Sequence, residues 1–168
     1  MAPDLFWIPG PWHGRLAISA RPRGGDWLED EARGWRHAGI DMVVSLLETN
    51  EATQLDLLGE RKAAEKNGIR FFSFPIPDRG VPVSTKDAVS VINNIMHALE
   101  TGKNVAVHCR QGIGRSGLIA AGVLMMSGAT PEGALQAVSS IRGTAIPETP
   151  EQHRWAQQLP SELLVPRR

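Results

Sequence analysis

The stretch NVAVHCRQGIGRSGLIA, residues 104–120, decides the fold class and raises the question of function. NVAVH is an apolar, β-branched run typical of a buried strand, and residues 118–126 form a nearly all-apolar run that predicts a buried helix. A glycine-containing loop therefore joins a strand to a helix. Two kinds of site use such a junction: a dinucleotide-binding turn, and a phosphate cradle with a nucleophile at its base.

The dinucleotide interpretation rests on Gly112, Gly114 and Gly117, which fit the pattern G-x-G-x-x-G. Such a site also needs a second strand after the helix, with an acidic residue about 20 positions on to bind the ribose. The sequence that follows, ATPEGALQAVSSIRG, has a helical pattern and no strand. We therefore favour the phosphate cradle.

The phosphate cradle accounts for more of the residues in this stretch. Glycines at 112 and 114 let successive backbone N–H groups converge on one anion, and the following helix directs its positive end at that anion. The guanidinium of Arg115 can bind two phosphate oxygens at once. Cys109 lies in the same positive field, which favours its thiolate. A thiolate that faces a bound phosphate is a nucleophile for phosphoryl transfer. The alternative for Cys109 is a small, buried, inert side chain.

The rest of the chain alternates short apolar runs with helical patterns. Residues 16–20, 41–47 and 69–74 predict three more strands, with a polar break over residues 48–51 after the second of them. Cap signals and apolar spacing predict helices that begin at Asp26, near Leu55, at Ser84, near Arg115, at Thr130 and at Thr149. This order predicts an α/β fold with a mostly parallel sheet of about four to five strands flanked by helices. We expect one domain over residues 1–168.

The loop sequence HCRQGIGRS matches His-Cys-x5-Arg-Ser/Thr, the signature of the cysteine-dependent protein tyrosine and dual-specificity phosphatases. From about residue 41 to residue 155 the chain resembles the small, atypical dual-specificity phosphatases. The residues before Leu16 resemble nothing that we can place. The resemblance implies a central, mostly parallel sheet flanked by helices, which agrees with the alternation above.

The resemblance also assigns roles to the loop. It implies that Cys109 attacks phosphorus to form a phosphocysteine, that Arg115 clamps the phosphoryl oxygens, and that Ser116 hydrogen-bonds the thiolate as it leaves. It further implies that His108 orders the loop. The substrate-binding residues are then Arg110, Gln111, Gly112, Ile113, Gly114 and Arg115.

Asp78, in PIPDRGVP, is the candidate general acid. It follows the strand predicted over residues 69–74, and the carboxyl ends of parallel strands meet at one edge of a sheet. The resemblance implies the same role, since the general acid of the family occupies such a loop. The alternative is a Pro-Asp-x-Gly turn. Glu48, beside the end of another predicted strand, is the second candidate acid.

Gln152 has two interpretations. TPEQ fits a capping box, which by itself explains a glutamine at the third helical position. The resemblance implies that the side chain of Gln152 positions the hydrolytic water.

The composition limits the partners, the cellular location and the metal or disulfide chemistry that we expect. Lys+Arg and Asp+Glu balance at 18 each, so no bulk charge favours nucleic acid or an anionic membrane. The N-terminus lacks a signal-peptide pattern, and the longest uncharged stretch, residues 116–131, is too short to span a bilayer. The single cysteine excludes an intrachain disulfide, and the five histidines show no paired ligand spacing. We expect a cytoplasmic monomer without metal or cofactor.

The sequence therefore predicts a phosphomonoesterase that hydrolyses phosphotyrosine, and potentially phosphoserine and phosphothreonine, in a phosphorylated protein or peptide. One alternative is a phosphate-binding interaction module without turnover, which would not need Cys109, Asp78 or Ser116. Another is a phosphatase for a non-protein phosphate such as a phosphoinositide, although the loop RQGIG lacks the lysines typical of such relatives. A sulfurtransferase would leave Asp78 and Arg115 unexplained, and arsenate reduction through a cysteine relay needs a second thiol.

Overall fold

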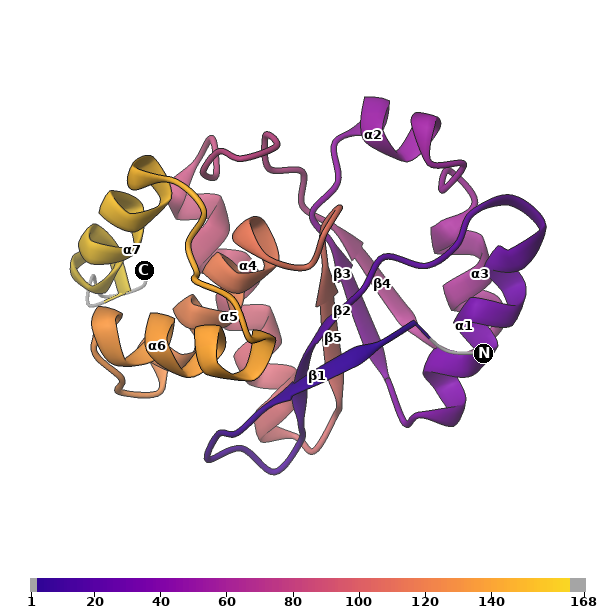
Figure 1. Ribbon diagram of the computed structural model, residues 1–168. Coiled ribbons are helices and arrows are strands. Elements are labelled where there is room, and N and C mark those ends of the chain that lie inside the picture. The colour runs from indigo at the N-terminus through magenta and orange to yellow at the C-terminus, as the bar shows by residue number, and fades with distance from the viewer. Residues whose placement is uncertain (1–2, 164–168) are drawn as a thin grey trace.

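The computed structural model describes residues 3–163, and its centre is a five-stranded sheet of order β1-β2-β5-β3-β4 (Figure 1). The strands are β1 (Leu5–Ile8), β2 (Leu16–Ser19), β3 (Met42–Ser45), β4 (Arg70–Ser73) and β5 (Val105–His108). β2, β5, β3 and β4 are parallel, and β1 pairs antiparallel with β2 at one edge. The α/β fold with a mostly parallel sheet is confirmed.

Helices cover both faces of the sheet. They are η1 (Gly25–Trp27), α1 (Leu28–His37), α2 (Thr49–Gln54), α3 (Glu60–Lys66), α4 (Thr85–Glu100), α5 (Gly114–Met126), α6 (Pro131–Arg142) and α7 (Pro150–Leu163). In Figure 1, α4 to α7 lie on one side of the sheet and α1 and α3 lie on the other.

The two faces follow from the alternation of side chains along each strand. In β5, Val105 and Val107 belong to the larger core cluster, under α4 to α7, whereas Ala106 belongs to the cluster under α1 and α3. Both clusters are closed to solvent, so β5 reads as a continuous apolar run, as central parallel strands do.

Four strands were predicted from the sequence to within two residues at each end, but β1 was not. Its residues Leu5, Phe6 and Trp7 are all half-buried, so no alternation of buried and exposed positions distinguishes it. Strand β3 ends before the polar break over residues 48–51, as predicted, but the helical region predicted from near Leu55 begins earlier, at Thr49, and is divided into α2 and α3. Glu51 turns its carboxylate back onto the N–H of Glu48, which stabilises the first turn of α2.

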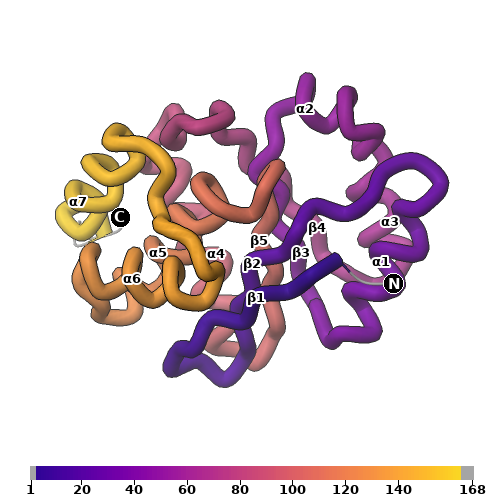
Figure 2. The backbone as a smooth tube through the Cα atoms, viewed as in Figure 1, coloured from indigo at the N-terminus to yellow at the C-terminus, as the bar shows by residue number. Residues whose placement is uncertain are grey.

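The sheet brings three loops to one end. The loops that follow β3, β4 and β5 come together beside the start of α5, as the backbone tube in Figure 2 shows and as the contacts of Arg115 confirm. These are the carboxyl ends of neighbouring parallel strands, where α/β proteins place their sites.

Candidate active site

The phosphate-binding loop, residues 109–114, links β5 to α5. Cys109 is the first residue after β5 and is 3% exposed. Gly112 has a φ of 69°, a left-handed conformation that favours glycine, so the chain can curl before α5 begins. At Gly114 an added Cβ would lie 2.2 Å from a carboxylate oxygen of Glu148, so a larger residue there would require the end of that side chain to move. Glycine is therefore favoured at positions 112 and 114 for different physical reasons.

Cys109 and Ser116 are in hydrogen-bond contact at the start of α5. Their Sγ and Oγ atoms are 3.2 Å apart, and Ser116 is fully buried. The hydroxyl can donate to a thiolate, and the positive end of α5 lies beside the sulfur. The sulfur thus lies beside a hydroxyl donor at the N-terminus of α5.

Arg115 is buried and held by groups from two segments of the chain, Leu46 and Glu51 after β3 and Ile76 and Asp78 after β4. Its Nη1 and Nη2 donate to the two carboxylate oxygens of Glu51 at 2.6 and 2.8 Å. Nη1 also donates to the carbonyl of Ile76 at 2.9 Å, and Nη2 to Asp78 Oδ1 at 3.2 Å. These bonds use the terminal nitrogens, and the side chain also lines the pocket beside Cys109. A bound phosphate would therefore meet a guanidinium whose plane is already fixed.

The ion pair between Arg115 and Glu51 shifts both partners toward their charged forms. Burial alone would lower the pKa of Arg115, but its hydrogen bonds to Glu51 and the negative charges of Cys109, Glu51 and Asp78 raise that pKa above its ordinary value. Burial alone would raise the pKa of Glu51, but the hydrogen bonds from Arg115 and from the Glu48 N–H lower it. The clamp thus stays charged.

Replacing Glu51 with glutamine should destabilise the protein most near neutral pH. The pKa of folded Glu51 is below its ordinary value of 4.5, so its stabilising contribution is present above that pH and is lost as the pH falls through the lowered value. Removing one partner of a buried ion pair costs about 3–5 kcal/mol. Chemical denaturation of wild type and Glu51→Gln across the acid range would show the two stabilities converging as pH falls. A gap of constant size would contradict this account.

Asp78 lies in the loop after β4 and reaches the pocket. Its side chain is 56% exposed, in contrast to Arg115, and one carboxylate oxygen contacts Nη2 of Arg115. The turn predicted around it is present as well, because the N–H of Gly80 donates to the carbonyl of Pro77 at 2.8 Å. The two interpretations of Asp78 are therefore compatible. Glu48 is not among the residues that line the pocket.

Gln152 is fully buried and joins two loops. Its Nε2 donates to the carbonyl of Gly80 at 3.0 Å, and its Oε1 accepts from the N–H of Glu148 at 3.0 Å. Its own N–H donates to the hydroxyl of Thr149, which is half of the predicted capping box. The side-chain amide thus ties the Asp78 loop to the start of α7.

His108 supports the loop from the opposite face of the sheet. The ring is fully buried, contacts Glu60 Oε1 through Nε2 at 2.5 Å and stacks on Trp35 with centroids 5.9 Å apart. Nδ1 is 3.4 Å from the carbonyl of Cys109. The ring is too deep to reach a substrate, as expected of a residue that orders the loop.

A pocket of about 120 Å³ lies at the junction of these loops. It is lined by Asp78, Arg79, Cys109, Arg110, Gln111, Arg115 and Glu148. Three arginines against two carboxylates make it a site for an anion. Of the predicted substrate-binding residues, Arg110, Gln111 and Arg115 line the pocket with their own atoms. Gly112, Ile113 and Gly114 complete the loop behind them.

Three site residues were not singled out from the sequence. Glu51 anchors Arg115, Glu60 anchors His108, and Glu148 lines the pocket, 3.7 Å from Nη1 of Arg79. A buried arginine or histidine requires an acidic or carbonyl partner, which is a usable signal that such residues exist. Which glutamate supplies it depends on tertiary packing.

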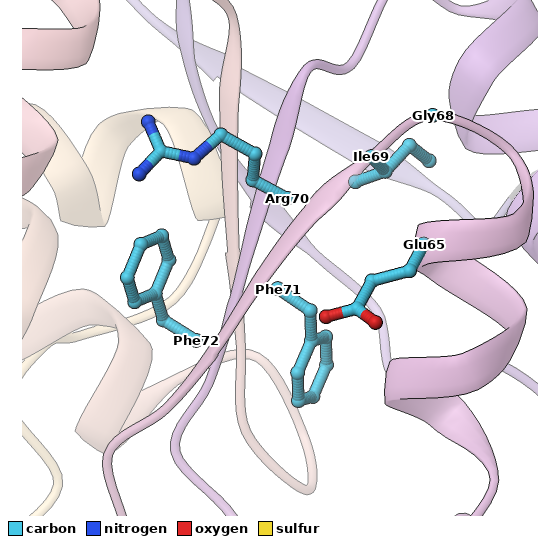
Figure 3. Close-up of a pocket in the computed structure, with 6 residues that line it drawn as sticks. All are labelled: Glu65, Gly68, Ile69, Arg70, Phe71 and Phe72. Carbon is cyan, nitrogen blue, oxygen red and sulfur yellow. The ribbon is translucent and has the colours of Figure 1, made fainter.

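A larger hollow of about 320 Å³ lies along the edge strand β4 (Figure 3). It is lined by Glu65, Gly68, Ile69, Arg70, Phe71 and Phe72. The guanidinium of Arg70 lies 5.2 Å from the ring of Phe72, and Arg61 donates to the carbonyl of Phe71, so side chains cover part of this edge. The lining contains no nucleophile, and the chemistry of the chain is concentrated at the phosphate-binding loop.

Comparison with known families agrees with this geometry. Residues 19–129 match the profile of the family described as "Polymorphic toxin system, DSP-PTPase phosphatase". The chain belongs to this phosphatase family.

Individual relatives of the phosphatase point the same way. It is 30% identical over 135 residues to the putative tyrosine phosphatase 197R of Invertebrate iridescent virus 6, covering 78% of its own chain and 48% of that protein. The chain thus spans about half the length of this relative. The structure of Tk-PTP in its active form matches with a TM-score of 0.79 and 31% identity, over 95% of this chain and 97% of the other.

The same fold occurs in a more distant relative. The structure of kinase associated phosphatase matches with a TM-score of 0.89 at 18% identity, over 99% of both chains. Within residues 3–163, the phosphatase has no helix long and apolar enough to cross a membrane. The same residues bring together no group of three His, Cys, Asp or Glu side chains that could hold a metal.

Proposed function

We propose that the chain is one catalytic domain that hydrolyses phosphate monoesters, chiefly phosphotyrosine in proteins, through a phosphocysteine. The observation that carries this proposal is the contact of Cys109 with Ser116 at the base of a pocket that Arg115 also lines. The family assignment supports it. The structure of kinase associated phosphatase was solved with serine in place of its catalytic-site cysteine, which shows a cysteine in that role in a protein of the same fold.

In the first step, the thiolate of Cys109 attacks phosphorus and the bond from phosphorus to the leaving oxygen breaks. Asp78, in its protonated form, gives its proton to that oxygen, so the product leaves as a neutral alcohol or phenol. Arg115 and the loop N–H groups bind the phosphoryl oxygens throughout. The contact of Asp78 with Nη2 of Arg115 supports this pairing of an acid with a clamp.

In the second step, water attacks phosphorus and the S–P bond breaks. The carboxylate of Asp78 takes a proton from that water, and the electron pair of the S–P bond returns to Cys109 as thiolate. The hydroxyl of Ser116, 3.2 Å from Sγ, stabilises this leaving thiolate. Inorganic phosphate is released and the enzyme is restored.

We infer that Gln152 acts first as a tether for the Asp78 loop. Each end of its amide already makes one bond, to Gly80 and to Glu148, so the side chain holds two loops together, while one N–H of Nε2 and one lone pair of Oε1 stay available to a water. The water-positioning role stays a prediction beside this one. The tether would support protonation of the leaving group in the first step, whereas water positioning would support hydrolysis of the phosphocysteine in the second.

Gln152→Ala separates the two roles. A tether holds Asp78, so its loss should lower turnover roughly tenfold, most strongly for esters whose leaving group needs a proton. A water-positioning residue would instead slow hydrolysis of the intermediate, so phosphocysteine would accumulate. Rapid-quench mass spectrometry of Cys109 during turnover measures that accumulation, and abundant phosphocysteine in the variant would overturn the tether.

Two alternatives remain to be tested against the main proposal. PTPMT1, which matches with a TM-score of 0.75 at 21% identity, has been solved in complex with PI(5)P, and this suggests a phosphoinositide as a second substrate class. A binding module without turnover would keep Arg115 but has no use for the Cys109–Ser116 contact.

Hydrolysis of p-nitrophenyl phosphate, a phosphotyrosine peptide, a phosphothreonine peptide and a soluble phosphoinositide, each with a chelator present, tests all three. Turnover of the phosphotyrosine peptide with the highest kcat/KM supports the proposal. Preference for the phosphoinositide would move the assignment to lipids. Binding of all four compounds without phosphate release would establish a binding module.

The setting that we propose is cytoplasmic, and the working form is a monomer. A reactive free thiol such as Cys109 persists best where thiols are kept reduced. Cell fractionation and sedimentation of the active protein test the two statements separately, and activity confined to a dimer would contradict the second.

A further inference from the structure

Arg142, the last residue of α6, binds the outer side of the phosphate-binding loop. Its Nε donates to the carbonyl of Gly112 at 2.6 Å, and its Nη2 lies 3.4 Å from the carbonyl of Gln111. Arg142 is half-buried and is not among the residues that line the pocket. It therefore contacts the loop from behind, on the side away from the substrate.

These two bonds fix the direction of two peptide groups. In a planar trans peptide the carbonyl and the N–H that follows it point in opposite directions. The carbonyls of Gln111 and Gly112 share their peptide planes with the N–H groups of Gly112 and Ile113. Because Arg142 holds the carbonyls outward, the N–H groups are turned toward the other side, where the pocket opens.

Arg142 is itself held by the N-terminal strand. Its guanidinium lies over the ring of Phe6 in β1, 3.9 Å from the centroid, and α6 packs against β1. Phe6 belongs to the margin of the larger core cluster, on the face of the sheet that α6 covers. A cation over an aromatic face is held in place by the negative charge of that face.

We propose that Arg142 is a positioning residue for the phosphate site, and that β1 belongs to that site because Phe6 holds Arg142 in place. This gives a role to the N-terminal residues that the sequence left without one. The inference rests on the proposed function for the identity of the anion. The orientation of the loop N–H groups follows from the contacts alone.

The variant that tests the proposal is Arg142→Met, which keeps a long apolar stem over Phe6 but removes every donor. We expect its orthovanadate dissociation constant, measured by calorimetry, to rise about 10-fold to 100-fold, since bonds to a charged donor are lost. Phe6→Leu keeps the donors and removes the aromatic face, so its dissociation constant should rise about 2-fold to 5-fold. In both variants, the vanadate-induced shifts of the Gly112 and Ile113 amide resonances should be smaller than in wild type.

β1 supplies a matched control. Arg15 lies over the ring of Trp7 at the same 3.9 Å, but Trp7 packs with the cluster on the opposite face of the sheet. Arg15→Met and Trp7→Leu therefore remove an equivalent pair far from the loop. Both controls should bind vanadate as wild type does, even where their thermal stability falls as much as that of the test variants.

Wild-type vanadate affinity in folded Arg142→Met would overturn the proposal, and so would equal losses in the Arg142 and Arg15 variants. If Arg142→Met does not fold, Phe6→Leu decides, and unchanged affinity in that variant overturns the proposal. Vanadate binding needs no turnover, so these results stand apart from the substrate assays. A wild type that binds vanadate but hydrolyses no ester would refute the proposed function and leave this test intact.

Discussion

Replacing Cys109 with serine is expected to abolish turnover of every phosphate ester while leaving the pocket able to bind an anion. The serine hydroxyl is not ionised by the field of α5 and Arg115, so no nucleophile of sufficient strength remains. The loss should be roughly 10⁴-fold or more, the scale seen when a covalent nucleophile is removed. Initial rates with p-nitrophenyl phosphate measure it.

Binding of a phosphotyrosine peptide to the Cys109→Ser variant is the companion measurement. Arg115 is held by Glu51 and Ile76, and neither contact involves the sulfur, so the clamp should survive the substitution. Ser116→Ala serves as the matched control, because it removes the partner hydroxyl and keeps the thiol. Substantial ester hydrolysis by a pure Cys109→Ser preparation would rule out the covalent mechanism.

Asp78→Asn should lower turnover by roughly 10²-fold to 10⁴-fold for esters of poor leaving groups, the usual contribution of a general acid. Asparagine can still accept a hydrogen bond from Nη2 of Arg115, but it cannot carry the proton. For p-nitrophenyl phosphate the loss should be much smaller, because p-nitrophenolate departs without protonation. A plot of turnover against leaving-group acidity measures this dependence.

Glu48→Gln is the control for that experiment. Glu48 precedes α2 and does not line the pocket, so its replacement should leave the leaving-group dependence unchanged. Equal losses in Asp78→Asn with good and poor leaving groups would instead remove Asp78 from the role of acid.

The nucleophile and the residues around it could be predicted from the sequence because they lie close together along the chain. Cys109, Arg115 and Ser116 lie within one strand–loop–helix unit, so their relative positions follow from the turn that the glycines permit. Asp78 was reachable because parallel strands end at a common edge. The strands themselves were predictable because their buried runs are β-branched and apolar.

The remaining site residues depend on contacts between distant parts of the chain. Glu51 is 64 positions from Arg115, and Arg142 is 30 positions from Gly112. Nothing in the polar sequence of α2 shows that its single glutamate, Glu51, turns inward. The edge strand β1 was missed for a related reason, since half-buried residues give no clear pattern until the neighbouring strand and α6 are in place.

Because β5 lies at the centre of the sheet, the two loops of the site differ in how freely their sequences can change. β5 is paired on both sides, and α5 is buried along nearly its whole length, so the loop between them should open only with the molecule as a whole. The Asp78 loop is anchored in the core by Ile76 and Val81, but Asp78 itself is 56% exposed, so only the tip of this loop belongs to the part that opens at low cost. Substitutions that alter substrate preference can therefore accumulate in the acid loop over generations without endangering folding. Substitutions in the phosphate-binding loop, by contrast, would also disturb the packing of β5 and α5 in the core.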